Sequence, residues 1–192
     1  MNVLFAVLSA LIVIIASIPY IIDIFTGRAQ PARSTRIMYM LLVILGLLQS
    51  KELGSGWSLA LIYGEIAQGS AVFFMSLKYG LGGFSRLDKI CYIFLTLDLS
   101  VWLLTKNPLI GILLTLFADL IATLPTIVKT IKIPESETPI YLFLVSIAAI
   151  FAIFSETTYS LIKIIFPIYI FVINAFVFSL TLKRSKRNIL SH

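Results

Sequence analysis

The sequence has very few of the residues that most catalytic and metal centres require. It contains one cysteine, Cys91, and one histidine, His192. A single cysteine cannot form an intramolecular disulfide, and neither residue has a partner at a metal-binding spacing. The patterns G-x-S-x-G and H-E-x-x-H are also absent. We therefore expect no enzyme, no metal site and no cofactor.

Charge is scarce as well. Only 12% of the 192 residues are charged, whereas 59% are hydrophobic, and the mean hydropathy is +1.03. A soluble domain of this size cannot bury so much apolar surface, so the composition predicts a multi-pass membrane protein. The net charge of +6 does not indicate a nucleic-acid partner, because the basic residues fall in the polar breaks between apolar runs.

The apolar runs predict seven membrane-spanning helices and an all-α fold. Lipid cannot satisfy free backbone groups, and the runs are continuous rather than alternating, which excludes barrel strands. The first run lacks a basic leader and is too long for a cleaved signal peptide, so we expect it to be retained. The predicted spans are residues 3–25, 36–50, 57–79, 88–105, 109–131, 139–155 and 158–182.

The basic residues orient these spans. With the N-terminus outside, the outer side holds only Lys51, Lys106 and Lys163, and all other basic residues are cytoplasmic. The positive-inside rule thus predicts an outer N-terminus and a cytoplasmic C-terminus, and we expect the cytoplasmic membrane of a bacterium. The predicted cytoplasmic residues are Arg28, Arg33, Arg36, Lys78, Arg86, Lys89, Lys129, Lys132, Lys183, Arg184, Lys186 and Arg187.

One proline-centred phrase occurs twice. "IASIPYIIDI" contains Pro19 and "IATLPTIVKT" contains Pro125, and each is followed by a polar loop, "QPARST" or "IPESET". A short helix follows in each case, and then a long helix opened by "WSL" or "YSL". We therefore divide the chain into a three-helix repeat (1–80), a linker helix (81–107), a second repeat (108–183) and a basic tail (184–192). The linker makes the two repeats parallel.

This arrangement resembles the SWEET and PQ-loop superfamily of transporters over nearly the whole chain. The resemblance rests on Pro19, Pro125, the polar loops that follow them, and Asn174 in the last helix. The proline-glutamine dipeptide is absent, because Tyr20 follows the first proline and Thr126 the second.

The resemblance implies a carrier of small polar solutes in which the two prolines act as hinges. It also implies an asparagine in each third helix and aromatic residues in the short helices. Asn174 fits the first expectation, while the third helix of the first repeat offers Gln68 and Ser70 instead. Tyr39 and Tyr141 are the aromatic candidates in the short helices.

Three acidic residues lie deep in predicted spans, where a charge costs about 2.5–3.5 kcal/mol on insertion scales. Glu65, Gln68 and Gly69 share one helix face, which can form a pocket wall or bond neighbouring helices together. Asp119, ahead of Pro125, is a candidate proton carrier. Asp98 lies on the linker helix, for which we favour a structural role.

Asp23 and Lys129 occupy equivalent positions in the two phrases. They can form a cytoplasmic gate ion pair, or each can lie at the membrane interface with its charge in water.

The sequence thus predicts a transporter that works by alternating access, with proton coupling left open. The expected partners are a small polar solute, protons and the lipid bilayer, and an oligomer is left open. The alternative is a ligand-binding or sorting receptor on the same fold, like the KDEL receptor, without solute flux.

Overall fold

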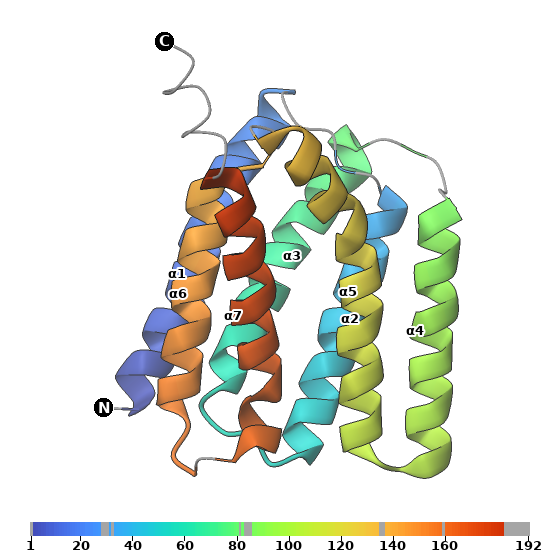
Figure 1. The fold of residues 1–192 in the computed structure, drawn as a ribbon, viewed down its shortest axis with the longest axis vertical. Helices are drawn as coiled ribbons and strands as arrows, with labels where there is room; N and C mark the ends of the chain where they lie inside the picture. Colours follow the sequence, from blue (N-terminus) through green and yellow to red (C-terminus); the bar gives the residue numbers. More distant parts are fainter. Residues whose placement is uncertain are drawn as a thin grey trace.

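The computed structural model describes residues 2–27, 31, 33–80, 82, 86–134, 137–158 and 160–182, with only the backbone described at 86, 87 and 125. Arg28, the side chains of Arg86 and Pro125, and the tail 184–192 with its basic residues therefore lie outside the described residues, as does Lys183. The described part forms seven helices and no strand (Figure 1). The helices are α1 (Asn2–Phe25), α2 (Arg33–Glu52), α3 (Leu59–Tyr79), α4 (Arg86–Thr105), α5 (Pro108–Lys132), α6 (Pro139–Ser155) and α7 (Leu161–Leu182).

The second and seventh helices differ most from the predicted spans. The second helix, expected over 36–50, runs from Arg33 to Glu52, because charged residues can continue a helix beyond its apolar run. The seventh, expected from 158, begins at Leu161 after a polar connection. Helix starts have local causes: the Asn107 side chain accepts hydrogen bonds from the amides of Leu109 and Ile110, which caps α5.

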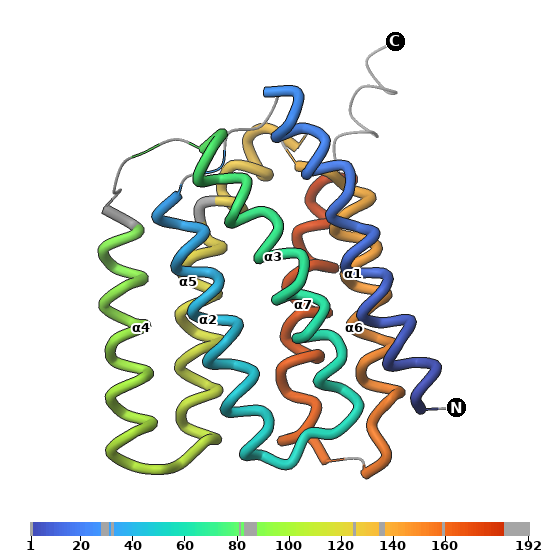
Figure 2. Tube along the Cα trace, turned by 180° about the vertical axis from the view of Figure 1, so that it is seen from behind, coloured from blue at the N-terminus to red at the C-terminus, as the bar shows by residue number. Residues whose placement is uncertain are grey.

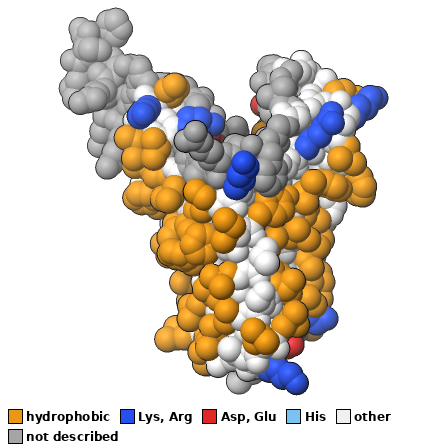
Figure 3. All heavy atoms as spheres, turned by 90° about the vertical axis from the view of Figure 1, so that its right-hand side faces the viewer, with side chains coloured by type: hydrophobic (Ala, Val, Ile, Leu, Met, Phe, Trp, Pro, Cys, Tyr) orange, Lys and Arg blue, Asp and Glu red, His pale blue; other side chains and the backbone are white. Residues whose placement is uncertain are grey.

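The described part includes four helices that are long and apolar enough to cross a membrane, namely α1, α3, α5 and α7. Helix α6 is apolar but has 17 residues, and α2 and α4 carry several charges. Side chains such as Leu4, Ile15 and Ile22 on α1 are exposed apolar groups that lipid can cover. Figure 3 shows hydrophobic side chains over the flank of the molecule and basic ones toward its ends. The chain is therefore a membrane protein, while seven spans remain a prediction.

Six helices pack in a closed circle. Each contacts its neighbours in the order α1, α3, α2, α5, α7, α6 and back to α1. Helix α4 lies outside this circle and packs on α5 and α2, as Figure 2 shows from behind. We call α1–α3 the first half and α5–α7 the second half. The halves therefore meet along α1 with α6 and along α2 with α5.

The two ends of the molecule carry different connections. The α1–α2, α3–α4 and α5–α6 connections lie at the end drawn at the top of Figure 1, here called the upper end. The α2–α3, α4–α5 and α6–α7 connections lie at the lower end. Helices α1, α3, α5 and α7 therefore run upward, and α2, α4 and α6 run downward.

Buried clusters join the two halves at the middle of the molecule and toward its lower end. Val13 and Leu61 pack against Ala148, Ala149 and Ala152, and these five side chains are buried. The small residues on α6 let α1 approach closely, and the Ser9 hydroxyl donates a hydrogen bond of 2.8 Å to the Ala148 carbonyl. A second cluster joins α3 to α5 and α7 and contains Ile62, Ile112 and Phe166.

Candidate functional site

A cavity of about 520 Å³ lies between the two halves. It is of the size that commonly binds small molecules. Residues from the middle of α3, α5 and α7 line it together with residues near the upper ends of α2, α4 and α6. Figure 3 shows the surface hollowed at the upper end. The cavity therefore reaches from the middle of the molecule toward the upper end.

The cavity brings together most of the residues that the sequence singled out. Ser70 is not among the residues that line it. Helix α1 contributes no described lining residue, whereas α2, α4 and α6 do. The predicted residues on the cavity wall are Tyr39, Glu65, Gln68, Asp119, Tyr141 and Asn174.

Four acidic residues line this space, Glu65, Asp88, Asp119 and Glu137. The two that lie at the middle of their helices, Glu65 and Asp119, each have a neutral partner. Gln68 donates a hydrogen bond of 2.7 Å to Glu65 on the same helix. The Tyr169 hydroxyl of α7 donates a bond of 2.6 Å to Asp119 of α5. Among the described residues, neither carboxyl forms an ion pair with a lysine or arginine. The cavity thus offers acceptors to a solute that carries hydrogen-bond donors or a positive charge.

Besides the acids and Arg36, the polar wall contains amide, phenol and hydroxyl groups. Asn174 donates a hydrogen bond of 2.9 Å to the Ile170 carbonyl of its own helix, which leaves its side-chain oxygen available. Tyr39 and Tyr141 come from the two downward helices of opposite halves. Such groups orient a polar solute through hydrogen bonds and stacking rather than through charge. Within the described residues, no three metal-ligating side chains converge to hold an ion.

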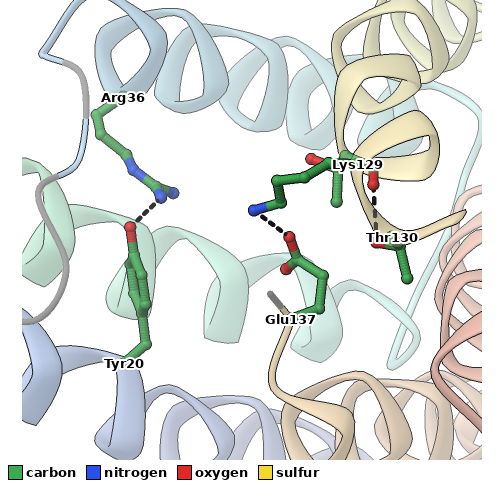
Figure 4. Close-up of polar contacts among 6 residues, drawn as sticks. Tyr20, Arg36, Lys129, Thr130 and Glu137 are labelled. Atoms are coloured by element: carbon green, nitrogen blue, oxygen red, sulfur yellow. Dashed lines mark hydrogen bonds and ion pairs between the residues drawn. The ribbon is translucent and has the colours of Figure 1, made fainter. Parts of the chain in front are cut away.

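Figure 4 shows two polar contacts at the upper mouth of the cavity, each within one half. In the first half, the Arg36 guanidinium donates a hydrogen bond of 2.6 Å to the Tyr20 hydroxyl and lies 5.1 Å from the centre of that ring. In the second half, Lys129 forms an ion pair of 2.6 Å with Glu137. The partner that the structure gives Lys129 is thus Glu137, and the pairing with Asp23 stays a prediction.

The lower end is closed by polar contacts between the halves. The buried carboxylate of Glu156, just after α6, accepts hydrogen bonds of 2.8 Å from the Gly56 amide and from the Ser58 hydroxyl. The Ser58 amide lies 3.4 Å from the same oxygen. The Ser55 hydroxyl donates a bond of 2.7 Å to the Lys163 carbonyl. We call this cluster the Glu156 latch.

Hydrogen bonds to the Glu156 carboxyl group determine whether it is ionised. Burial alone raises the pKa of Glu156, but bonds from the Gly56 amide, the Ser58 hydroxyl and amide, and the Thr157 amide outweigh it, so the pKa is lowered. The carboxylate is therefore ionised at neutral pH, when it accepts these bonds most strongly.

The sequence alone did not identify the functional residues that depend on contacts between distant segments. Glu156 and the "GSGWS" segment stand about 100 positions apart, and Arg36 was identified only as a basic residue for orientation. A usable signal existed for the latch, since a glycine- and serine-rich turn before a helix exposes amides that suit a carboxylate.

The predicted hinges are only partly described. Pro19 lies inside α1, which continues unbroken from Asn2 to Phe25. Helix α5 likewise continues through position 125. Pro167 is a further proline inside α7.

Comparison of the chain with protein-family models, with curated proteins and with solved structures gives no significant match.

Proposed function

We propose that this chain is a transporter of a small polar solute that works by alternating access, with seven spanning helices arranged as in the SWEET and PQ-loop superfamily. The observation that carries the proposal is the cavity between the two halves, which reaches the upper end and is closed at the lower end. A carrier needs a central site that opens to one side at a time.

The packing of the helices supports the proposed internal repeat. Exchanging α1 with α5, α2 with α6 and α3 with α7 turns every contact of the six-helix circle into another contact of that circle. For example, α1 with α6 becomes α5 with α2. Two parallel repeats related by an axis along the membrane normal have this property. Helix α4, outside the circle, then serves as the linker.

In the proposed orientation the upper end is cytoplasmic. It carries Arg33, Arg36, Lys78, Lys129 and Lys132 at or near the helix ends, in line with the positive-inside rule. The cavity is then open to the cytoplasm, and the Glu156 latch closes the outer side.

Glu65, Gln68 and Asn174 would bind the polar groups of the solute, with Tyr39 and Tyr141 on the facing helices. Asp119 would carry the proton, because it reaches the same cavity and has a neutral tyrosine as partner.

Alternating access also requires the upper end to close. Figure 4 shows the Arg36 and Lys129 side chains directed toward each other across a gap, each with a partner from its own half. Approach of the halves would bring Arg36 to Glu137, so that a bond within one half is replaced by an ion pair between halves. Pro19 and Pro125 would act as the hinges, because a proline removes a helical hydrogen bond and permits bending.

The proposal is tested by solute flux into proteoliposomes. Small neutral, zwitterionic and cationic polar solutes are first screened by thermal shift, and those that stabilise the protein are then assayed with and without a pH gradient. We expect flux of at least one, reduced strongly in Glu65→Gln and unchanged in Ser70→Ala, since Ser70 does not line the cavity. A solute that binds tightly but never crosses would refute transport and support the receptor.

The hinges have a separate test. Pro19→Ala and Pro125→Ala should slow flux while the protein still inserts and binds the solute. Rates equal to those of the unaltered protein in both variants would refute the hinge role.

A further inference from the structure

Three buried polar side chains meet at one point near the cavity floor. Gln49 of α2, Asp98 of α4 and Thr115 of α5 are 0%, 0% and 2% exposed. The Gln49 amide nitrogen lies 3.0 Å from Oδ1 of Asp98, and the Thr115 hydroxyl lies 2.8 Å from Oε1 of Gln49. The same hydroxyl also contacts Oδ2 of Asp98. We call these residues the Asp98 triad.

The contacts of the triad require one more hydrogen than Gln49 and Thr115 supply. The three contacts need three hydrogens, one for each pair of atoms. The Gln49 amide presents its nitrogen to one contact and its oxygen to the other, so it supplies one hydrogen, and the Thr115 hydroxyl has only one. The third hydrogen must therefore come from Asp98.

Reversing the Gln49 amide does not change this count. In the reversed orientation Gln49 donates to Thr115, and Thr115 donates to Oδ2 of Asp98. Oδ1 of Asp98 then faces the amide oxygen and must itself carry the hydrogen. An ionised Asp98 would leave two oxygens in close contact without a hydrogen in either orientation, inside a buried site where such a contact is costly.

The charges around the triad also favour the neutral acid. Helix α4 packs on α5 and α2, and the titratable side chains of these helices within about one turn of the triad in sequence are Lys51, Glu52 and Asp119. Two of the three are acids, and the one base, Lys51, is exposed rather than part of the triad. Further titratable groups on the three helices are Arg33, Arg36, Tyr39, Asp88, Lys89, Cys91, Tyr92, Lys129 and Lys132. None of the described contacts of Asp98 is with a basic residue.

We propose that Asp98 is a proton-binding site, held as a neutral carboxylic acid in a closed hydrogen-bonded triad with Gln49 and Thr115. The packing around the triad supports a protonated Asp98. Gly111 leaves the space for Gln49, since a Cβ there would lie 2.7 Å from its amide nitrogen. Thr115 also lines the cavity, which gives the proton a route to water.

The triad links α2 of the first half to α5 of the second half through α4. Loss of the proton removes one of its three hydrogen bonds and weakens this link. The proton site stands on the contacts of the triad and does not depend on the proposed transport of a solute.

The test is infrared difference spectroscopy of the full-length protein in lipid at neutral pH. Asp98→Asn should remove a protonated-carboxyl band, because asparagine can occupy the triad with the same number of hydrogens. The matched control is Asp88→Asn. Asp88 accepts one hydroxyl hydrogen on each oxygen, from Ser34 at 2.9 Å and Thr35 at 2.8 Å, so it needs no proton and its loss should leave the band unchanged. An equal band in Asp98→Asn and in the unaltered protein would refute the proposal.

If Asp98→Asn does not fold, a second measurement tests the proposal without this variant. The unaltered protein and Asp119→Asn are labelled with carbon-13 at the aspartate carboxyls, and solid-state NMR is recorded across pH. A protonated-aspartate resonance that persists in Asp119→Asn supports the proposal. Carboxylate resonances alone in Asp119→Asn would overturn it.

Discussion

The Glu156 latch gives the sharpest prediction, because one oxygen atom joins the two halves at the lower end. Glu156→Gln keeps an acceptor at this position but removes its charge. Hydrogen bonds to a charged group contribute about 1.5–3 kcal/mol, against about 0.5–1.5 kcal/mol for neutral ones. The substitution should therefore cost about 1 kcal/mol for each of the two 2.8 Å bonds, from the Gly56 amide and the Ser58 hydroxyl.

A loss of about 2 kcal/mol corresponds to a change of roughly 30-fold in an equilibrium. We expect the Gly56 amide to exchange its hydrogen roughly 30-fold faster in Glu156→Gln, since exchange reports local opening. The assay is hydrogen exchange resolved to single amides. The Ser55 amide, bonded at 3.0 Å to the Ser50 carbonyl of the same connection, is the internal reference and should change little.

The matched control is Glu52→Gln, an exposed acid at the same end that accepts a bond of 3.0 Å from the Trp102 indole. It should leave Gly56 exchange unchanged. Equal exchange at Gly56 in Glu156→Gln and in the unaltered protein would refute the latch. Faster exchange at Gly56 and Ser55 alike would indicate general loosening of the connection instead.

The latch also has a defined pH dependence. The pKa of Glu156 is lowered in the folded protein despite its burial, because the bonds to Gly56, Ser58 and Thr157 favour the ionised form. Its contribution is then fully present above the unfolded value of about 4.3 and is lost as the pH falls through the lowered folded value. Closure of the lower end should therefore be insensitive to pH between about 5 and 8.

Three further variants test separate parts of the structure. Asp119→Asn should abolish any several-fold stimulation of flux by a proton gradient while solute binding, measured by thermal shift, is kept. Arg36→Glu with Glu137→Arg should restore flux that each single change lowers a few-fold, the size expected for a partly exposed pair; if only the swap of Asp23 and Lys129 restores it, the gate is that pair. Gly64→Ala, which places a Cβ 3.0 Å from a backbone oxygen of α1, should cost about 1–3 kcal/mol and lower Tm by about 2–4 °C per kcal/mol.

The sequence predicted the number of helices and most of their bounds, because apolar runs and helix-breaking segments are local signals. It predicted that the second helix ends at residue 50, but the helix continues to Glu52, because Lys51 and Glu52 interrupt the apolar run without ending the helix. Residues on a mid-helix polar face, such as Glu65 and Gln68, could be identified because a polar side chain in a span needs a cavity or a partner. Ser70 was instead a candidate from the family resemblance. It follows Gly69, which lines the cavity, but one position along a helix rotates a side chain by about 100°, and Ser70 does not line it.

The remaining features depend on pairings between distant segments, for which a single sequence holds little information. Asp98 was interpreted as structural because its helix was expected to lie apart from the cavity. Its partners, Gln49 and Thr115, come from helices 49 and 17 positions away, and only their joint geometry reveals the missing hydrogen. Likewise Glu156 gains its role from Gly56 and Ser58, 100 and 98 positions distant.

The polar bonds at the lower end and at the mouth of the cavity differ in whether they join the two halves, and this difference bears on the transport mechanism. At the lower end they join the halves, through Glu156 to Gly56 and through Gln49 to Thr115. At the mouth of the cavity the pairs of Arg36 and Lys129 lie within a half. A rocking motion that opens the lower end must break the first set, and it can recover that free energy only if the second set forms bonds across the halves. Approach of the oppositely charged Arg36 and Glu137 would supply such a bond. A variant that weakens the lower bonds should therefore favour the arrangement open at the lower end, whereas a variant that prevents the Arg36–Glu137 bond should favour the arrangement open at the mouth. Combined in one chain, the two variants should partly cancel.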